Sequence, residues 1–153
     1  MVALDWKWLF IYPEDEIATV NELALPVDVP VEFIVTSDTV MNSFFIPQIG
    51  SQIYAMAGME NRVHLIGNEE GVYRGLSANY SGFGFSGMKF KTHVLSEDNF
   101  ANWKANIKKA PGILNDERYA KLSGKSKDHP IEYFSSVNPL MFNSIIEKHT
   151  GNK

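Results

Sequence analysis

The sequence SANYSGFGFSGM, residues 77–88, joins two predicted β-strands, one over 72–79 and one over 88–94. Its glycines allow the backbone to turn tightly between the two strands. The other side chains are mostly hydroxyls, an amide and aromatic rings, and the segment ends on the thioether of Met88. A glycine-rich loop between two short strands predicts that the surrounding part of the chain is built from β-structure.

Strand-like stretches continue from this loop towards the N-terminus. Residues 31–36 alternate between apolar and polar side chains, as expected for a strand with one solvated face, and Trp6, Trp8 and Phe10 recur at period two. Proline or glycine separates most of the stretches. We predict strands over 2–12, 17–23, 31–36, 40–46, 52–57, 62–66, 72–79 and 88–94. Many short strands with regular turn signals predict a mainly β fold, either a sandwich or a barrel.

The pattern changes to a helical one after residue 95. Ser96 is a predicted N-cap followed by two acidic residues, Asn115 can cap a second helix, and Asn138 with Pro139 at the first helical position opens a third. We therefore divide the chain into a β domain over 1–95 and an aromatic-rich helical extension over 96–153 that packs on it.

Composition excludes several classes of function. The chain has 153 residues, a net charge of −4 and no cysteine. One domain with a small appendage fits this length, and a nucleic-acid-binding protein would need a basic face. Without cysteine the chain can build no thiolate centre of copper, zinc or iron–sulfur type. No apolar run is long enough to cross a membrane, and strand patterning begins so soon after Met1 that we expect a piece of a longer protein.

Two further patterns suggest sites at first sight. Gly82, Gly84 and Gly87 have the spacing of a dinucleotide-binding fingerprint, but a strand follows them where that motif needs a helix. Methionines around the loop could bind Cu(I), although methionines more commonly fill apolar gaps or line protein contacts. They are Met41, Met56, Met59 and Met88. Neither pattern predicts a catalytic site.

Residues 77–88, together with 42–47 upstream, resemble the dicopper site of subunit II of cytochrome c oxidases. In that family the loop has the motif Cys-x-Glu-x-Cys-x-x-x-His-x-x-Met, and a further His lies upstream. The positions that would carry the ligands hold Asn42, Ser77, Asn79, Ser81, Phe85 and Met88. A hydroxyl, an amide and a phenyl ring are poor ligands for a soft metal, so only the methionine is kept.

The resemblance covers nearly the whole chain and is closest to subunit II of bacterial bo-type ubiquinol oxidases. The segments that carry it are 3–13, 40–47, 50–59 and 80–90, with an aromatic-rich tail over 99–149. It implies a cupredoxin-like Greek-key sandwich or barrel with a C-terminal helical extension. It also implies two preceding transmembrane helices, a place on the periplasmic face of the inner membrane, and a complex that oxidises ubiquinol, reduces oxygen and moves protons.

The same resemblance implies that this domain has no catalytic residue, no cofactor and no metal. Haems and copper would belong to subunit I, and ubiquinol would be bound by the complex rather than by this domain. In the cytochrome c oxidases the loop at 50–61 carries Lys, Asp and Arg, whereas this chain has Gln52, Tyr54 and Met59 there. Asn79 likewise replaces an acidic residue near their magnesium site.

We expect a structural role in assembly, through contact with subunit I. The candidate contact residues are aromatic or apolar and lie near the expected membrane junction or in an apolar loop, namely Trp6, Trp8, Tyr54, Met56 and Met59. The alternative is a free-standing cupredoxin-like module that binds or handles copper. A menaquinol oxidase subunit is a nearer alternative that the sequence does not separate from the first.

Overall fold

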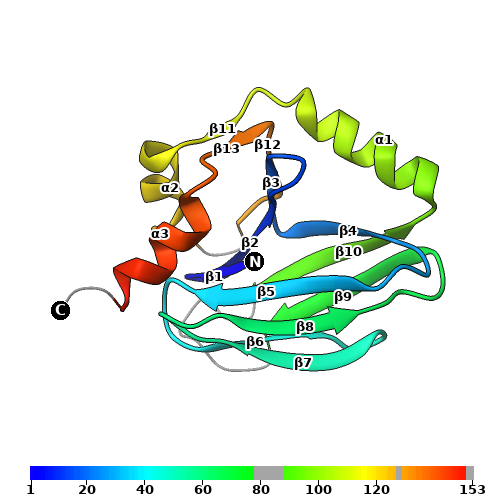
Figure 1. The fold of residues 1–153 in the computed structure, drawn as a ribbon, viewed down its shortest axis with the longest axis horizontal. Helices are drawn as coiled ribbons and strands as arrows, with labels where there is room; N and C mark the ends of the chain where they lie inside the picture. The colour runs from blue at the N-terminus through cyan, green and yellow to red at the C-terminus, as the bar shows by residue number, and fades with distance from the viewer. Residues whose placement is uncertain (78–87, 127–128, 151–153) are drawn as a thin grey trace.

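The computed structural model describes residues 1–77, 88–126 and 129–150. Two β-sheets face each other, and helices lie outside them (Figure 1). The first sheet has the order β12-β3-β2-β1-β5-β8 and the second the order β4-β10-β9-β6-β7. Their bounds are β1 Val2–Leu4, β2 Lys7–Tyr12, β3 Ile17–Val20, β4 Glu22–Pro26, β5 Val31–Ser37, β6 Asn42–Ile46, β7 Gly50–Ala55, β8 Asn61–Leu65, β9 Gly71–Ser77, β10 Lys89–Leu95 and β12 Glu132–Phe134.

The C-terminal third carries the helices. They are α1 Glu97–Lys108, α2 Asp116–Leu122 and α3 Met141–Lys148, and a small parallel pair is formed by β11 Ile113–Leu114 and β13 Ser136–Val137. Ser96 accepts a hydrogen bond from the Asn99 amide, and Asn115 accepts one from that of Arg118, so both predicted caps are confirmed. None of the helices in the described part of the chain is long and apolar enough to cross a membrane.

The third helix begins later than predicted. Pro139 was expected at its first position, but α3 starts at Met141. The Asn138 side chain accepts a hydrogen bond from the Leu140 amide, and its carbonyl accepts one from the Met141 amide. These bonds fold 138–141 into a turn, which delays the helix.

Two predicted strands are broken by residues with positive φ. The stretch 2–12 is a hairpin in which Leu4 pairs with Lys7, and Trp6 at φ 70° lies in its turn. The stretch 17–23 divides at Asn21, whose φ is 63°, into β3 of the first sheet and β4 of the second. Asparagine tolerates this conformation better than most residues, and here it marks the crossing from one sheet to the other.

An aromatic core fills the space between the sheets. Trp8 is fully buried and meets the rings of Phe44 and Phe90 edge-on at centroid distances of 5.7 and 5.9 Å. Phe44 and Phe90 stack at 5.3 Å, and Phe33 packs on Phe44. Edge and stacked ring contacts of this kind add to the free energy of apolar burial.

A second core lies between the first sheet and the C-terminal extension. Strand β12 pairs antiparallel with β3, so the extension adds a strand to the first sheet. The buried residues of this core come from β1 to β3 on one side and from the extension on the other, namely Val2, Leu4, Leu9, Ala18, Val20, Leu114, Tyr119, Leu122, Phe134, Val137, Met141 and Ile145. The predicted mainly β fold with a helical extension is confirmed, whereas strand β12 was not predicted.

Candidate functional site

Three positions of the loop that resembles a copper site lie in the described residues. They are Asn42 at the start of β6, Ser77 at the end of β9 and Met88 just before β10. All three side chains are buried. Asn79, Ser81 and Phe85 lie outside the described residues.

The sheet brings Asn42 and Ser77 together although they are far apart in sequence. Strands β6 and β9 are antiparallel neighbours, with Phe44 opposite Ser77. The Ser77 hydroxyl donates a hydrogen bond to Asn42 Oδ1 at 3.0 Å, and Asn42 Nδ2 donates one to the Val40 carbonyl, also at 3.0 Å. Most buried polar groups in proteins are hydrogen-bonded, and this pair joins two neighbouring strands of the second sheet.

These described residues do not fit a copper ion. Copper at an electron-transfer centre is held by thiolate and imidazole, with a thioether as a weak axial ligand. The chain has no cysteine, and the described residues contain no group of three or more His, Cys, Asp or Glu that could hold a metal. Met88 packs in the aromatic core between the sheets, and the amide and hydroxyl beside it bond to each other.

An exposed apolar surface lies at the same end of the second sheet. Tyr54 and Met59 are each 48% exposed and Met56 is half-buried, while Val40 and Met41 are 55% and 42% exposed. Asn42 pairs with Ala55, and Ser37 bridges Ala57, so these two segments run side by side. We call these five apolar residues the terminal apolar surface. The predicted contact residues did not include Val40 or Met41, because apolar residues in a predicted strand are expected to face the core.

The two tryptophans of the predicted contact differ in how far they are buried. Trp8 cannot contribute to a contact with another subunit, because it is fully buried between the sheets, so this part of the prediction is wrong. Trp6 is half-buried in the turn between β1 and β2. Asp5 accepts a hydrogen bond from the Thr39 hydroxyl, which places this turn next to Val40. Trp6 therefore stays a candidate at the edge of the terminal apolar surface.

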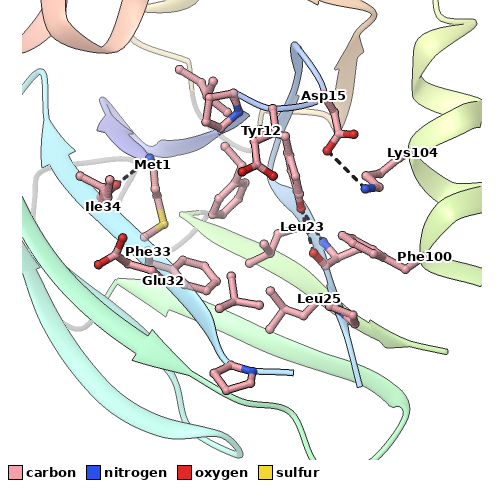
Figure 2. Close-up of a pocket in the computed structure, with 18 residues that line it drawn as sticks. Met1, Tyr12, Asp15, Leu23, Leu25, Glu32, Phe33, Ile34, Phe100 and Lys104 are labelled. Atoms are coloured by element: carbon pink, nitrogen blue, oxygen red, sulfur yellow. Dashed lines mark hydrogen bonds and ion pairs between the residues drawn. The ribbon is translucent and has the colours of Figure 1, made fainter. Parts of the chain in front are cut away.

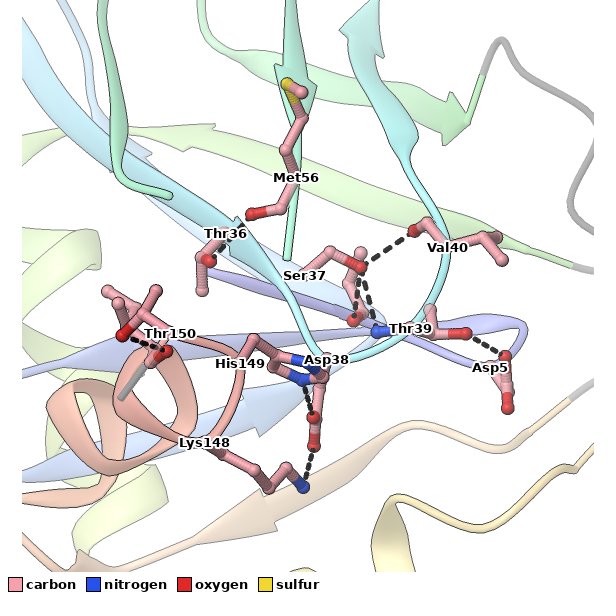
Figure 3. Close-up of polar contacts among 12 residues, drawn as sticks. Asp5, Thr36, Ser37, Asp38, Thr39, Val40, Met56, Lys148, His149 and Thr150 are labelled. Carbon is pink, nitrogen blue, oxygen red and sulfur yellow. Dashed lines mark hydrogen bonds and ion pairs between the residues drawn. The ribbon is translucent and has the colours of Figure 1, made fainter. Parts of the chain in front are cut away.

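A buried carboxylate anchors the C-terminal helix beside this surface (Figure 3). The Asp38 side chain is 2% exposed and accepts hydrogen bonds from Tyr119 Oη at 2.5 Å, Lys148 Nζ at 2.9 Å and His149 Nε2 at 2.6 Å. Burial alone would raise the pKa of Asp38, but these donors outweigh it and hold the pKa below its ordinary value. Burial and the nearby carboxylate raise the pKa of Tyr119, which stays a donor at neutral pH.

The anchored helix end rests against the loop that carries Met56 and Met59. Gly58 has φ 77°, and a Cβ atom there would meet Thr150 Cγ2 at 2.8 Å. The Thr36 hydroxyl donates a hydrogen bond to the Met56 carbonyl at 3.1 Å (Figure 3). The loop is thus held from β5 on one side and from the end of α3 on the other.

A cavity of about 540 Å³ lies at another place, between the sheets and α1 (Figure 2). Apolar side chains such as Phe10, Leu25 and Phe33 line it, and Lys104 pairs with Asp15 at 3.3 Å at its edge. The residues that line it include no histidine, serine or cysteine. The lining therefore contains no Ser–His or Cys–His pair.

Two family models match the chain. The model described as "Cytochrome C oxidase subunit II, periplasmic domain" matches residues 5–95, and the "COX Aromatic Rich Motif" matches residues 108–153. A crystal structure of the periplasmic domain of subunit II of cytochrome oxidase from Bradyrhizobium japonicum is similar, with a TM-score of 0.66 and 21% identity. The match covers 69% of this chain and 88% of the Bradyrhizobium japonicum chain. This likeness confirms the predicted cupredoxin-like fold.

Relatives with higher sequence identity are oxidase subunits. Cytochrome bo(3) ubiquinol oxidase subunit 2 of Pseudomonas aeruginosa is 60% identical over 97% of this chain and 45% of its own length. Ubiquinol oxidase subunit 2 of Acetobacter aceti is 56% identical over 99% of this chain and 49% of its own length. The chain therefore spans about half the length of these relatives.

Proposed function

Because this chain belongs to the family of the periplasmic domain of cytochrome c oxidase subunit II, we propose that it is this domain in a ubiquinol oxidase and that it carries no copper. The complete complex would pass electrons from ubiquinol to oxygen at the bacterial inner membrane and move protons outward. Haems and copper would lie in subunit I, so this domain would not be catalytic. The identities of 60% and 56% to ubiquinol oxidase subunits support the choice of substrate.

The Asn42–Ser77 hydrogen bond is the observation that carries the copper-free part of the proposal. In a metal site, ligands from neighbouring strands are joined through the ion. Here two buried neutral groups satisfy each other directly at 3.0 Å, and binding a cation between them would cost this bond without providing a strong ligand. A substrate that arrives through the membrane needs no relay from a soluble electron carrier. This agrees with the absence of a copper site.

Without a redox centre, the domain would serve assembly and stability of the oxidase. The terminal apolar surface supports this role, because contiguous exposed apolar residues on a small domain commonly mark a protein contact. Its loop is fixed on both sides, by the Thr36–Met56 bond and by the end of α3 at Gly58. A contact loop held in one conformation loses less entropy when a partner binds.

Charge substitutions in the full-length subunit test this role. Tyr54→Glu with Met59→Glu should leave the isolated domain folded, since both side chains are half exposed, and should lower the yield of intact oxidase in solubilised membranes. Leu140→Glu is the matched control, because Leu140 is an exposed apolar residue elsewhere on the domain. Normal assembly of the double variant would overturn this surface as the contact.

A further inference from the structure

Three cations gather on the outer face of two neighbouring strands. Arg74 in β9 lies directly opposite Lys91 in β10, and Lys89 follows on the same face two residues before Lys91. All three side chains are exposed. Like charges opposite each other in a sheet are destabilising, and the chain as a whole carries a net charge of −4. This arrangement therefore costs stability on a protein that is otherwise acidic.

The neighbouring carboxylates do not neutralise these cations. Glu22 is opposite Lys91 in the register of β4 and β10, but its carboxylate bonds to His93, Trp103 and Tyr133 and is buried. The Glu132 carboxylate, on β12, pairs with Arg118 and His129. No ion pair of Arg74, Lys89 or Lys91 occurs within residues 1–77, 88–126 and 129–150.

The cations line a shallow, open hollow of about 430 Å³. Arg74, Lys89 and Lys91 lie on the strands, and the residues of segment 129–131 that border the hollow are His129 and Ile131. Asn21 Nδ2 donates a hydrogen bond to the His129 carbonyl at 3.0 Å, which fixes this segment against the sheets. Val72 and Ile131 add exposed apolar surface. We call this site the cationic hollow.

We propose that the cationic hollow binds an acidic segment of another protein, with carboxylates on Arg74, Lys89 and Lys91 and an apolar side chain against Val72 and Ile131. This face is distinct from the terminal apolar surface, so the proposal does not depend on the function proposed above. A carboxylate-rich partner removes the repulsion between Arg74 and Lys91. Recognition of an anionic membrane surface typically uses about four to eight clustered cations, whereas here three line a shallow hollow.

The test uses a fluorescently labelled short peptide rich in glutamate and leucine, and the same peptide with glutamine at every glutamate. We expect the acidic peptide to bind the 153-residue chain at low ionic strength, to bind less tightly as salt is added, and to lose affinity about tenfold or more in Arg74→Glu/Lys91→Glu. The control is Lys108→Glu/Lys109→Glu at the end of α1, which changes the net charge equally. It should bind like the unaltered chain.

Thermal melting of each variant shows whether the fold is retained, and Lys89→Gln, which removes one exposed cation, serves if the double variant unfolds. It should weaken binding in the same direction. Several outcomes would overturn the proposal. They are equal binding of the glutamine peptide, equal loss in the α1 control, no binding of the acidic peptide, and preferential binding to vesicles of anionic phospholipid.

Discussion

The hydrogen bond between Asn42 and Ser77 is the residue-scale feature that supports the proposed absence of copper. Both side chains are buried, and each belongs to a different strand of the second sheet. If one partner is removed, the other becomes a buried polar group without its bond, which costs more than the bond itself is worth. The pair therefore contributes to stability in a way that an exposed pair would not.

Ser77→Ala should lower the free energy of unfolding by about 1–3 kcal/mol, because Asn42 Oδ1 loses its buried donor. Urea unfolding followed by far-UV circular dichroism measures the change. Ser123→Ala is the control, since the Ser123 hydroxyl forms an exposed hydrogen bond at the end of α2. Equal losses of stability in both variants would show that the buried Asn42–Ser77 bond contributes no more than an exposed one.

Asp38 makes the stability of the domain depend on pH, and the lowered pKa of Asp38 sets the direction of that dependence. A carboxyl whose pKa is lower in the folded than in the unfolded state stabilises the fold when ionised. This contribution is complete above the ordinary pKa of 3.8 and is lost as the pH falls through the lower folded value. Tyr119, Lys148 and His149 all donate to this carboxylate, so the end of α3 should be the part released first in acid.

Asp38→Asn should destabilise the chain at neutral pH by about 2–3 kcal/mol, because hydrogen bonds to a charged acceptor are lost in a buried place. It should also flatten the decline of stability below pH 4, since the titrating group is gone. Urea midpoints measured across acidic and neutral pH test both effects. The control is Glu70→Gln, an exposed residue, and an equally steep acid decline in Asp38→Asn would contradict the assignment.

Some residues at the site were predictable and others were not. The resemblance to the dicopper site implied that Asn42 and Ser77 belong to one site, and the structure brings their side chains together. Trp8 was expected at a contact because it is aromatic and lies near the expected membrane junction, yet large aromatic residues also form cores. Only the pairing of strands decides between the two, and pairing depends on contacts distant in sequence. Asp38 carried no local signal, since its partners come from α2 and the end of α3.

At the scale of elements, strands β9 and β10 are held in register by a glycine that accommodates an aromatic ring. Gly75 lies opposite Phe90, and a Cβ atom at Gly75 would come within 2.0 Å of the Phe90 ring. Phe90 itself packs against Trp8, Phe10 and Phe44 in the core. The ring therefore cannot move without disturbing the whole aromatic cluster.

Gly75→Ala should destabilise the domain by about 1–3 kcal/mol, because the added methyl group overpacks the core at Phe90. For a chain of this size each kcal/mol lowers Tm by about 2–4 °C. Gly71→Ala at the other end of β9 is the control, since its Cβ would make only ordinary contacts, the nearest at 3.5 Å. A Tm equal to that of Gly71→Ala would contradict the close packing.

Element boundaries were predicted best where glycine or proline marks them. The breaks at Trp6 and Asn21 were missed for different reasons. The aromatic period of two continues through the hairpin turn, so nothing in the pattern indicates that Trp6 has a positive φ. At Asn21 both flanking segments are mostly apolar, and only the move from one sheet to the other separates β3 from β4.

At the scale of the whole molecule, the C-terminal extension completes the first sheet instead of forming a separate unit. Strands β1 and β3 are buried along their whole length. One face contributes to the core between the sheets, and the other is covered by the extension. Loss of the extension would expose a broad apolar face and remove the neighbour of β3 at the sheet edge.

A chain truncated after Leu95 should therefore lack a cooperative thermal transition and bind a hydrophobic dye strongly. The exposed residues would be Val2, Leu4, Leu9, Ala18 and Val20, which form the sheet side of the second core. Differential scanning calorimetry and dye fluorescence compare it with the 153-residue chain. A sharp transition in the truncated chain would show that residues 1–95 are an independent domain.

The central claim is that this member of the oxidase subunit II family has lost copper binding. Copper retained per chain, measured by mass spectrometry of the metal after Cu(I) or Cu(II) loading and desalting, tests it most directly. The positive control restores the ligand types of the resembling family and should acquire a coloured copper–thiolate site, with Asn42→His, Ser77→Cys, Ser81→Cys and Phe85→His. We predict that the unaltered chain retains essentially no copper. Stoichiometric copper coordinated through the thioether of Met88 would contradict the account.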